Sequence, residues 1–301
     1  MKTLLAVEAL TRINTEEILE VTGLENVRRG RALLEKICVP AARRFARQVA
    51  SFDLRVGTDG LREASLWFIG NHIRRLEVAG KENVPAEGPL LIVSNHPGLS
   101  DTLALFASLP RNDLRVVAAD RPFLRALSHT SQHLIYLRPA EPRQNLRKIA
   151  GHLRGGGSVL IFPGGQIEPD PAMADGNVES LQSWSNSVGL IVRLVKEIRV
   201  VPAIVSGVVC AAAQHHPLTK IRKERKNRER FGALLQTIVP TYKNVNVRVA
   251  FGPTLDQNAL QARGSDTAAI TETIIRHTRR LLGEQPSDWQ VIIESDGKRR
   301  Y

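Results

Sequence analysis

The segment Ser94–Asp101, with the sequence SNHPGLSD, constrains the fold more than any other part of the chain. The apolar run Leu90–Val93 precedes it and is typical of a buried strand. Thr102–Phe106 follow it and are predicted to begin a helix. A histidine, His96, therefore lies on a Pro-Gly turn at the carboxyl end of a strand. Open α/β sheets bind their ligands at that end of their strands.

Asp101 follows His96 by five positions, and a tight turn of that length allows the carboxylate to fold back onto the imidazole. The carboxylate would keep one ring nitrogen protonated and leave the other free as a base. The segment supplies no nucleophile, so this base would act on a hydroxyl brought by the substrate. The alternative is a histidine that caps a turn and an aspartate that caps a helix, without chemistry. The strand-turn-helix context favours chemistry.

Strands that alternate with helices indicate an α/β fold with a largely parallel central sheet flanked by helices. Besides the run before His96, strands are predicted over residues 77–80, 114–118, 133–137, 158–162, 200–209 and 245–251, and a helix over 266–282. Residues 1–76 are predicted to form an N-terminal helical region, and residues 77–301 the α/β domain. The polar end, residues 296–301, is expected to be frayed.

Two features are expected to divide the N-terminal helices. Pro40 breaks the helical run or opens a new helix, and Gly57–Gly60 has the composition of a turn. The next helix is expected over Leu61–Leu76, with apolar residues and arginines at helical spacing. A basic amphipathic helix of this kind packs on its own domain or lies on a membrane.

Charge and composition limit the classes of partner. Lys and Arg number 42 against 30 Asp and Glu, a formal net charge of +12 that favours an anionic membrane surface or nucleic acid. Aromatic residues, which base-stacking platforms need, are only 5% of the chain, so nucleic acid is the weaker expectation. The start of the chain shows no secretory signal, and its longest apolar run, residues 200–213, is too short and broken to span a bilayer. We therefore expect a cytoplasmic protein that associates peripherally with the membrane.

Four blocks of the sequence resemble the PlsC-type glycerolipid acyltransferases, which include the bacterial 1-acylglycerol-3-phosphate acyltransferases. The blocks are Gly80–His96 with Asp101, Tyr136–Arg138, Phe162–Glu168 and Val200–Ala203. The first contains the family's His-x4-Asp pattern, and the order and spacing of all four agree over about residues 77–210. The resemblance implies that residues 77–301 form an acyltransferase domain, which transfers an acyl group from a thioester to a hydroxyl.

The third block, Phe162–Glu168, departs from the family pattern Phe-Pro-Glu-Gly-Thr-Arg. Gly164 stands where the family has glutamate, and Gln166 with Ile167 stand where it has the Thr-Arg pair. In members that use glycerophosphates, that glutamate and arginine are thought to help hold the acceptor. The run Pro-Gly-Gly-x-x-Glu, which ends at Glu168, is similar to the block of diacylglycerol acyltransferases and phytyl ester synthases, whose acceptors are neutral.

The predicted activity is that of an O-acyltransferase acting on a lipid hydroxyl, such as lysophosphatidic acid or a related glycerolipid. His96 is expected to be the general base and Asp101 to orient it. The predicted substrate-binding residues are Asn95, Arg138, Gly164, Gly165, Gln166 and Glu168. The alternatives are an acyltransferase with a neutral-alcohol acceptor and a catalytically silent lipid-binding protein on the same fold.

Four of these residues have a second interpretation. The backbone N–H groups at Gly164 and Gly165 face the charge that develops on the attacked carbonyl, or these glycines form a plain turn. Glu168 binds an acceptor hydroxyl or caps a loop. Arg138 binds a phosphate or pairs with an acid.

The donor is expected to be acyl-CoA or acyl carrier protein, since both are acidic and suit a basic chain. No cofactor is expected. The neighbouring histidines His129 and His133, and likewise His215 and His216, lack further ligands at metal-binding spacing, so no metal is expected either.

Overall fold

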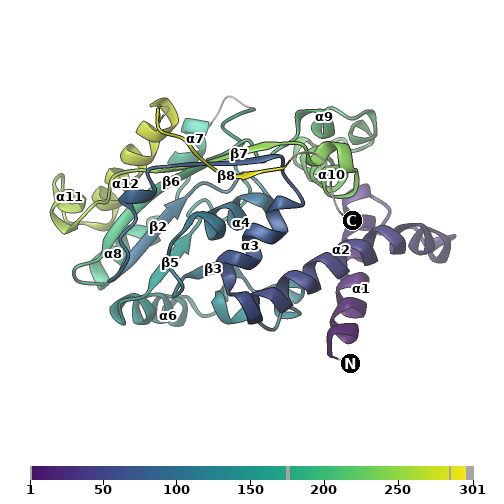
Figure 1. Cartoon of the computed structure of the whole chain (residues 1–301), viewed down its shortest axis with the longest axis horizontal. Helices are drawn as coiled ribbons and strands as arrows, with labels where there is room; N and C mark the ends of the chain where they lie inside the picture. Colours follow the sequence, from purple (N-terminus) through teal and green to yellow (C-terminus); the bar gives the residue numbers. More distant parts are fainter. Residues whose placement is uncertain (1, 174–176, 285, 296–301) are drawn as a thin grey trace.

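The computed structural model describes residues 2–173, 177–284 and 286–295, and it contains an eight-stranded sheet with helices on both faces (Figure 1). The predicted frayed end, residues 296–301, lies outside the described residues. The strands are β1 (Arg75–Ala79), β2 (Leu90–Ser94), β3 (Arg115–Ala119), β4 (Leu134–Leu137), β5 (Ser158–Ile161), β6 (Arg199–Ser206), β7 (Asn246–Phe251) and β8 (Gln290–Glu294). The α-helices are α1 (Lys2–Thr22), α2 (Arg31–Asp59), α3 (Leu61–Gly70), α4 (Leu99–Ser108), α5 (Pro122–Arg125), α6 (Pro142–Arg154), α7 (Asn177–Gln182), α8 (Ser187–Leu194), α9 (Ala211–Gln214), α10 (Arg225–Ile238), α11 (Gln257–Gln261) and α12 (Thr267–Gly283).

Five adjacent strands of the sheet are parallel, in the order β4-β3-β5-β2-β6. Beyond them, β7 runs antiparallel to β6, β1 parallel to β7, and β8 antiparallel to β1. The prediction of a largely parallel sheet flanked by helices is confirmed. All five residues of β2 are buried, which is typical of a central strand covered on both faces.

Neighbouring residues of β2 belong to two different cores. Leu90 and Ile92 belong to a core that includes α2, α3 and α4, whereas Leu91 and Val93 belong to one that includes α6, α8 and α12. Side chains alternate across a strand, so each face of the sheet carries its own layer of helices. The N-terminal helices α2 and α3 thus share the core of the sheet.

Helix α2 is continuous over 29 residues, so the predicted break at Pro40 is wrong. The predicted turn at Gly57–Gly60 is confirmed only at Gly60, which separates α2 from α3. A proline inside a helix removes one hydrogen bond. Burial of Ala46 and Val49 on the core side of the same helix outweighs that loss. The helix ends at Gly60, whose φ of 85° favours glycine.

Two further corrections concern the edge of the sheet. The helix predicted over Leu61–Leu76 ends at Gly70, because Arg75–Ala79 instead pairs with β7 as strand β1. Strand β8 has no counterpart among the predicted strands. It pairs with β1 at the edge of the sheet, and its first two residues are exposed, so its sequence lacks the apolar run of a buried strand.

The first two helices carry exposed apolar side chains. Leu4, Leu5, Leu33 and Ile37 are between 61% and 66% exposed. None of the helices in the described ranges is both long enough and apolar enough to traverse a bilayer.

Candidate active site

His96 lies on the turn between β2 and α4, at the carboxyl edge of the parallel strands. Its imidazole stacks on the ring of Phe162, which follows β5, with ring centroids 4.5 Å apart and an interplanar angle of 25°. Because β5 is hydrogen-bonded to β2, two adjacent strands bring these side chains to the same place. The His96 side chain is 26% exposed, so a substrate can reach a ring that the fold holds in position.

Asp101 lies in the first turn of α4, and its side chain is fully buried. Its Oδ2 lies 2.8 Å from Nδ1 of His96 and accepts a hydrogen bond from the backbone N–H of Gly98 at 2.9 Å. Its Oδ1 accepts hydrogen bonds from the backbone N–H of Thr102 and, at 3.0 Å, from the hydroxyl of the same residue. With Nδ1 of His96 donating to this carboxylate, Nε2 is the ring nitrogen that can act as a base.

Two carboxylates determine the protonation of His96. Burial disfavours the imidazolium, but the charge and hydrogen bond of Asp101, together with the charge of Glu168, raise the pKa of His96 above its ordinary value of 6.5. Burial in turn raises the pKa of Glu168, and its hydrogen bonds from Trp184 and His96 oppose that effect only in part. A base with a raised pKa takes a proton more readily once it is neutral.

The buried side chain of Asn95 joins β2 to β6. Its amide nitrogen donates to the carbonyl of Val205 at 2.9 Å, and its amide oxygen accepts a hydrogen bond from the N–H of Val205 at 2.8 Å. Asn95 therefore ties the start of the His96 turn to the next strand. Its role in substrate binding stays a prediction.

Glu168 reaches the same turn from the loop after β5. Its Oε2 accepts a hydrogen bond from the backbone N–H of His96 at 2.8 Å, and its Oε1 accepts one from Nε1 of Trp184 at 2.7 Å. Its own N–H donates to the carbonyl of His96 at 2.9 Å. The carboxylate thus caps the turn, and its predicted role in binding an acceptor hydroxyl stays a prediction.

The glycine-rich turn of the third block begins directly after β5. The N–H of Gly165 donates to the carbonyl of Phe162 at 3.1 Å, and the φ of Gly165 is 65°. Gly165 and Gln166 are exposed, whereas Gly164 is half-buried. The roles of Gly164, Gly165 and Gln166 in substrate binding stay predictions.

Arg138 directly follows β4, and β3 and β5 separate that strand from β2. Its guanidinium forms ion pairs with Glu141 at 3.3 Å and with Asp120 at 3.5 Å, and its side chain is 45% exposed. Exposed ion pairs contribute little free energy, so these acids leave room for a competing anion. The predicted contact of Arg138 with a phosphate stays a prediction.

Two buried residues support the site although no motif predicts them. Trp184 donates to Glu168, as described above. Asp170 accepts hydrogen bonds from the backbone N–H groups of Gly207 and Val209, both at 2.8 Å, and so ties the third block to the loop after β6. The only signals in the sequence are a carboxylate shortly after the third block and one of just three tryptophans in the chain.

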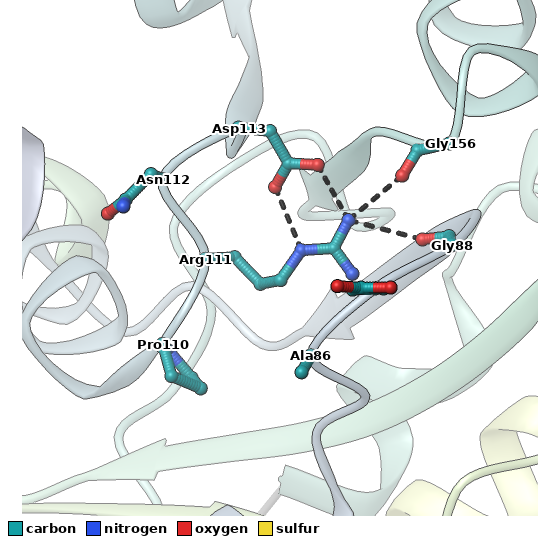
Figure 2. Close-up of a pocket in the computed structure, with 8 residues that line it drawn as sticks. Ala86, Gly88, Pro110, Arg111, Asn112, Asp113 and Gly156 are labelled. Atoms are coloured by element: carbon teal, nitrogen blue, oxygen red, sulfur yellow. Dashed lines mark hydrogen bonds and ion pairs between the residues drawn. The ribbon is translucent and has the colours of Figure 1, made fainter.

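A separate pocket lies at the opposite, amino edge of the strands (Figure 2). The buried guanidinium of Arg111 donates there to the carbonyls of Pro85, Gly88 and Gly156, and it pairs with Asp113 at 2.6 Å. Arg111 therefore joins the loops that precede β2, β3 and β5. Within the described part of the chain, His, Cys, Asp and Glu side chains form no group of three or more that could hold a metal ion.

Residues 75–206 match the family model described as Acyltransferase. This span contains every site residue predicted from the sequence. No curated protein matches the chain. Among solved structures, the chain is similar to the crystal structure of the 1-acyl-sn-glycerophosphate (LPA) acyltransferase PlsC from Thermotoga maritima. The identity is 16%, the TM-score is 0.45, and the match covers 95% of this chain and 98% of that chain.

Proposed function

We propose that this acyltransferase, whose family domain covers residues 75–206, transfers a fatty acyl group from an acyl thioester to the hydroxyl of a lipid. The match of residues 75–206 to an acyltransferase family model supports the proposal, and these residues contain all four sequence blocks. The similarity of the third block to diacylglycerol acyltransferases stays a prediction. The observation that supports the proposed chemistry is the contact of 2.8 Å between Nδ1 of His96 and the buried carboxylate of Asp101. An imidazole held in this way at a strand end can remove a proton from a bound hydroxyl.

In the proposed reaction, Nε2 of His96 takes the proton of the acceptor hydroxyl while the hydroxyl oxygen attacks the thioester carbonyl carbon. Asp101 stabilises the imidazolium that forms. The C–S bond then breaks, and the imidazolium returns the proton to the thiolate, so the products are an ester and a free thiol. The backbone N–H of Gly164 is the proposed donor to the negative carbonyl oxygen.

The proposed acceptor is lysophosphatidic acid or a related glycerolipid. Arg138 is the proposed phosphate ligand, because a guanidinium binds phosphate oxygens in pairs. The alternative is a neutral alcohol, since Gly164 and Ile167 carry no charge where the family pattern has glutamate and arginine. The proposed donor is acyl-CoA or acyl carrier protein.

The proposed site of action is the surface of an anionic membrane, where the acceptor resides. Leu33 and Ile37 are exposed on α2 and lie four positions apart, so they project from one face of that helix. The net charge of +12 favours anionic lipid. In this proposal helices α1 and α2 of the N-terminal region face the membrane. The division into residues 1–76 and an acyltransferase domain over residues 77–301 stays a prediction, and strand β1 begins at Arg75, just before that boundary.

Release of free thiol from a long-chain acyl-CoA tests the proposal. The wild type and the variant His96→Ala are compared with lysophosphatidic acid and with diacylglycerol as acceptors. We expect the wild type to release thiol and His96→Ala to be slower by at least about a hundredfold. The matched control is His215→Ala, because His215 is exposed on a different part of the fold.

The acceptor that supports turnover separates the two alternatives. Turnover with lysophosphatidic acid supports a phosphorylated acceptor, and turnover with diacylglycerol alone supports a neutral one. Thiol release that His96→Ala leaves unchanged would contradict the proposed chemistry. Lipid binding without turnover of acyl-CoA or acyl carrier protein would support the silent lipid-binding protein, which the altered third block favours.

A further inference from the structure

A single residue, Glu168, forms hydrogen bonds with both the backbone N–H and the backbone carbonyl of His96. Oε2 of Glu168 accepts a hydrogen bond from the N–H of His96 at 2.8 Å, and the carbonyl of His96 accepts one from the N–H of Glu168 at 2.9 Å. Glu168 is only 6% exposed, and Trp184 satisfies its other carboxylate oxygen at 2.7 Å. Both oxygens therefore already serve groups of the protein, which is a poor arrangement for an acceptor-binding side chain.

Gly164 supplies the space that this carboxylate occupies. A Cβ atom added at Gly164 would lie 2.7 Å from Oε1 of Glu168, closer than real Cβ atoms approach other heavy atoms, and 3.0 Å from its Cδ. Any side chain at position 164 would thus displace the Glu168 carboxylate. Gly164 has no side chain, and this leaves room for the carboxylate of Glu168 four residues later. The two residues therefore belong to one arrangement.

We infer that Glu168 is a positioning residue for the general base: it fixes the backbone of His96, and Gly164 is a glycine in order to admit it. The inference rests on the proposed function, because it assigns Glu168 to the base rather than to the acceptor. It accounts for the departure of the third block from the family pattern. The carboxylate lies four residues further along the chain and holds the histidine turn.

The charge of Glu168 provides a readout that a purely structural contact would not change. The titratable groups that influence the imidazole are Asp101, from α4, and Glu168, from the loop after β5. Phe162, which follows β5, also packs on the imidazole, but its ring is uncharged. Removal of the negative charge at 168 should therefore lower the pKa of His96 while Asp101 remains in place.

The variant Glu168→Gln tests the inference with two measurements. The first is the pKa of His96, obtained by NMR titration, with His96→Ala used to assign the resonance. The second is the pH dependence of kcat/KM for thiol release. We expect a lower pKa of His96, an acid limb displaced to lower pH, and a kcat lower by roughly tenfold to a hundredfold with KM for the acceptor little changed. The control is Glu179→Gln, which removes the same charge from exposed α7.

A double-mutant cycle tests the part played by Gly164. Gly164→Ala should reduce kcat about as much as Glu168→Ala, and it should have little further effect when Glu168 is already alanine. Additive effects of the two substitutions would contradict the shared arrangement. A raised acceptor KM in Glu168→Gln with an unchanged pKa of His96 would overturn the inference in favour of acceptor binding. The NMR titration does not require turnover, so failure of the inference and failure of the proposed activity give different results.

Discussion

The backbone N–H of Gly98 donates to the same carboxylate oxygen of Asp101 that meets the imidazole of His96. Gly98 is the residue before α4, and Asp101 is the third residue of that helix. A carboxylate in this position satisfies a free N–H at the helix start and lies at the positive end of the helix dipole. The spacing of five residues between His96 and Asp101 therefore results from the way the turn enters the helix.

Substitution Asp101→Asn should impair both catalysis and stability. The asparagine amide has an NH₂ group in place of one carboxylate oxygen, and that group then faces other hydrogen-bond donors. These donors are either Nδ1 of His96 and the N–H of Gly98, or the N–H and the hydroxyl of Thr102. We expect kcat to fall by a factor on the order of 10²–10⁴. We also expect the free energy of unfolding to fall by about 1–3 kcal/mol. Steady-state thiol release and urea unfolding measure the two effects.

The control for that experiment is Asp59→Asn, because Asp59 is an exposed residue at the end of α2. It should change neither quantity appreciably. Activity of Asp101→Asn within a factor of about ten of wild type would argue that His96 needs no carboxylate partner.

The pH dependence of the wild-type reaction follows from the raised pKa of His96. The imidazole must be neutral to accept a proton, and Asp101 and Glu168 favour its protonated form despite burial. The activity should therefore be low at acidic pH and rise through the pKa of His96, with a midpoint above 6.5. Measurement of kcat/KM from pH 5 to 9 checks this expectation. A midpoint below 6.5 would show that another group controls the rate.

Substitution Asn95→Asp distinguishes support of the fold from substrate binding. The carboxylate can still accept a hydrogen bond from the N–H of Val205, but it faces the carbonyl of Val205 where the amide donated. Because this pair is buried, we expect the free energy of unfolding to fall by about 1–3 kcal/mol. Thermal unfolding monitored by circular dichroism measures the loss. An unchanged midpoint together with a raised acceptor KM would instead assign Asn95 to substrate binding.

The sequence predicts the features that depend on neighbouring residues. Strand β2 is an uninterrupted apolar run, and the contact between His96 and Asp101 spans only five positions, so both follow from local pattern and spacing. The contact between Glu168 and His96 joins residues 72 positions apart, and it forms only because β5 pairs with β2. Local propensity likewise places a break at Pro40, whereas burial of the following turns of α2 keeps the helix continuous.

Asp53 should be a principal link between α2 and the rest of the chain. Its buried carboxylate accepts hydrogen bonds from the backbone N–H groups of His129 and Thr130 and from the hydroxyls of Ser128 and Thr130. Substitution Asp53→Ala leaves these donors without their partner, so we expect a loss of about 1–3 kcal/mol in the free energy of unfolding.

Hydrogen exchange gives a local test of the same variant. The amides of His129 and Thr130 should exchange faster in Asp53→Ala, while those of the central strand β2 should change only in proportion to global stability. Asp59→Ala is the matched control on the exposed side of α2. If the amides of His129 and Thr130 exchanged at the same rates in Asp53→Ala as in wild type, the hydrogen bonds of Asp53 would contribute nothing to local stability.

The proposed membrane contact predicts that Ile37→Glu weakens vesicle binding. Ile37 is 66% exposed, and Leu33 one turn earlier is 63% exposed, so both are available to insert among lipids. Burial of one such side chain contributes about 1.5–3 kcal/mol, which corresponds to a fall of at least about tenfold in the partition coefficient. Flotation with vesicles that contain phosphatidylglycerol measures this coefficient. Binding should also weaken as salt rises from low ionic strength to 0.5 M, because salt screens the attraction between the basic chain and the anionic lipid.

Leu194→Glu, on α8, is the control because that helix belongs to the core on the opposite face of the sheet. If Leu194→Glu weakened binding as much as Ile37→Glu, the membrane contact would have to lie elsewhere than on α2.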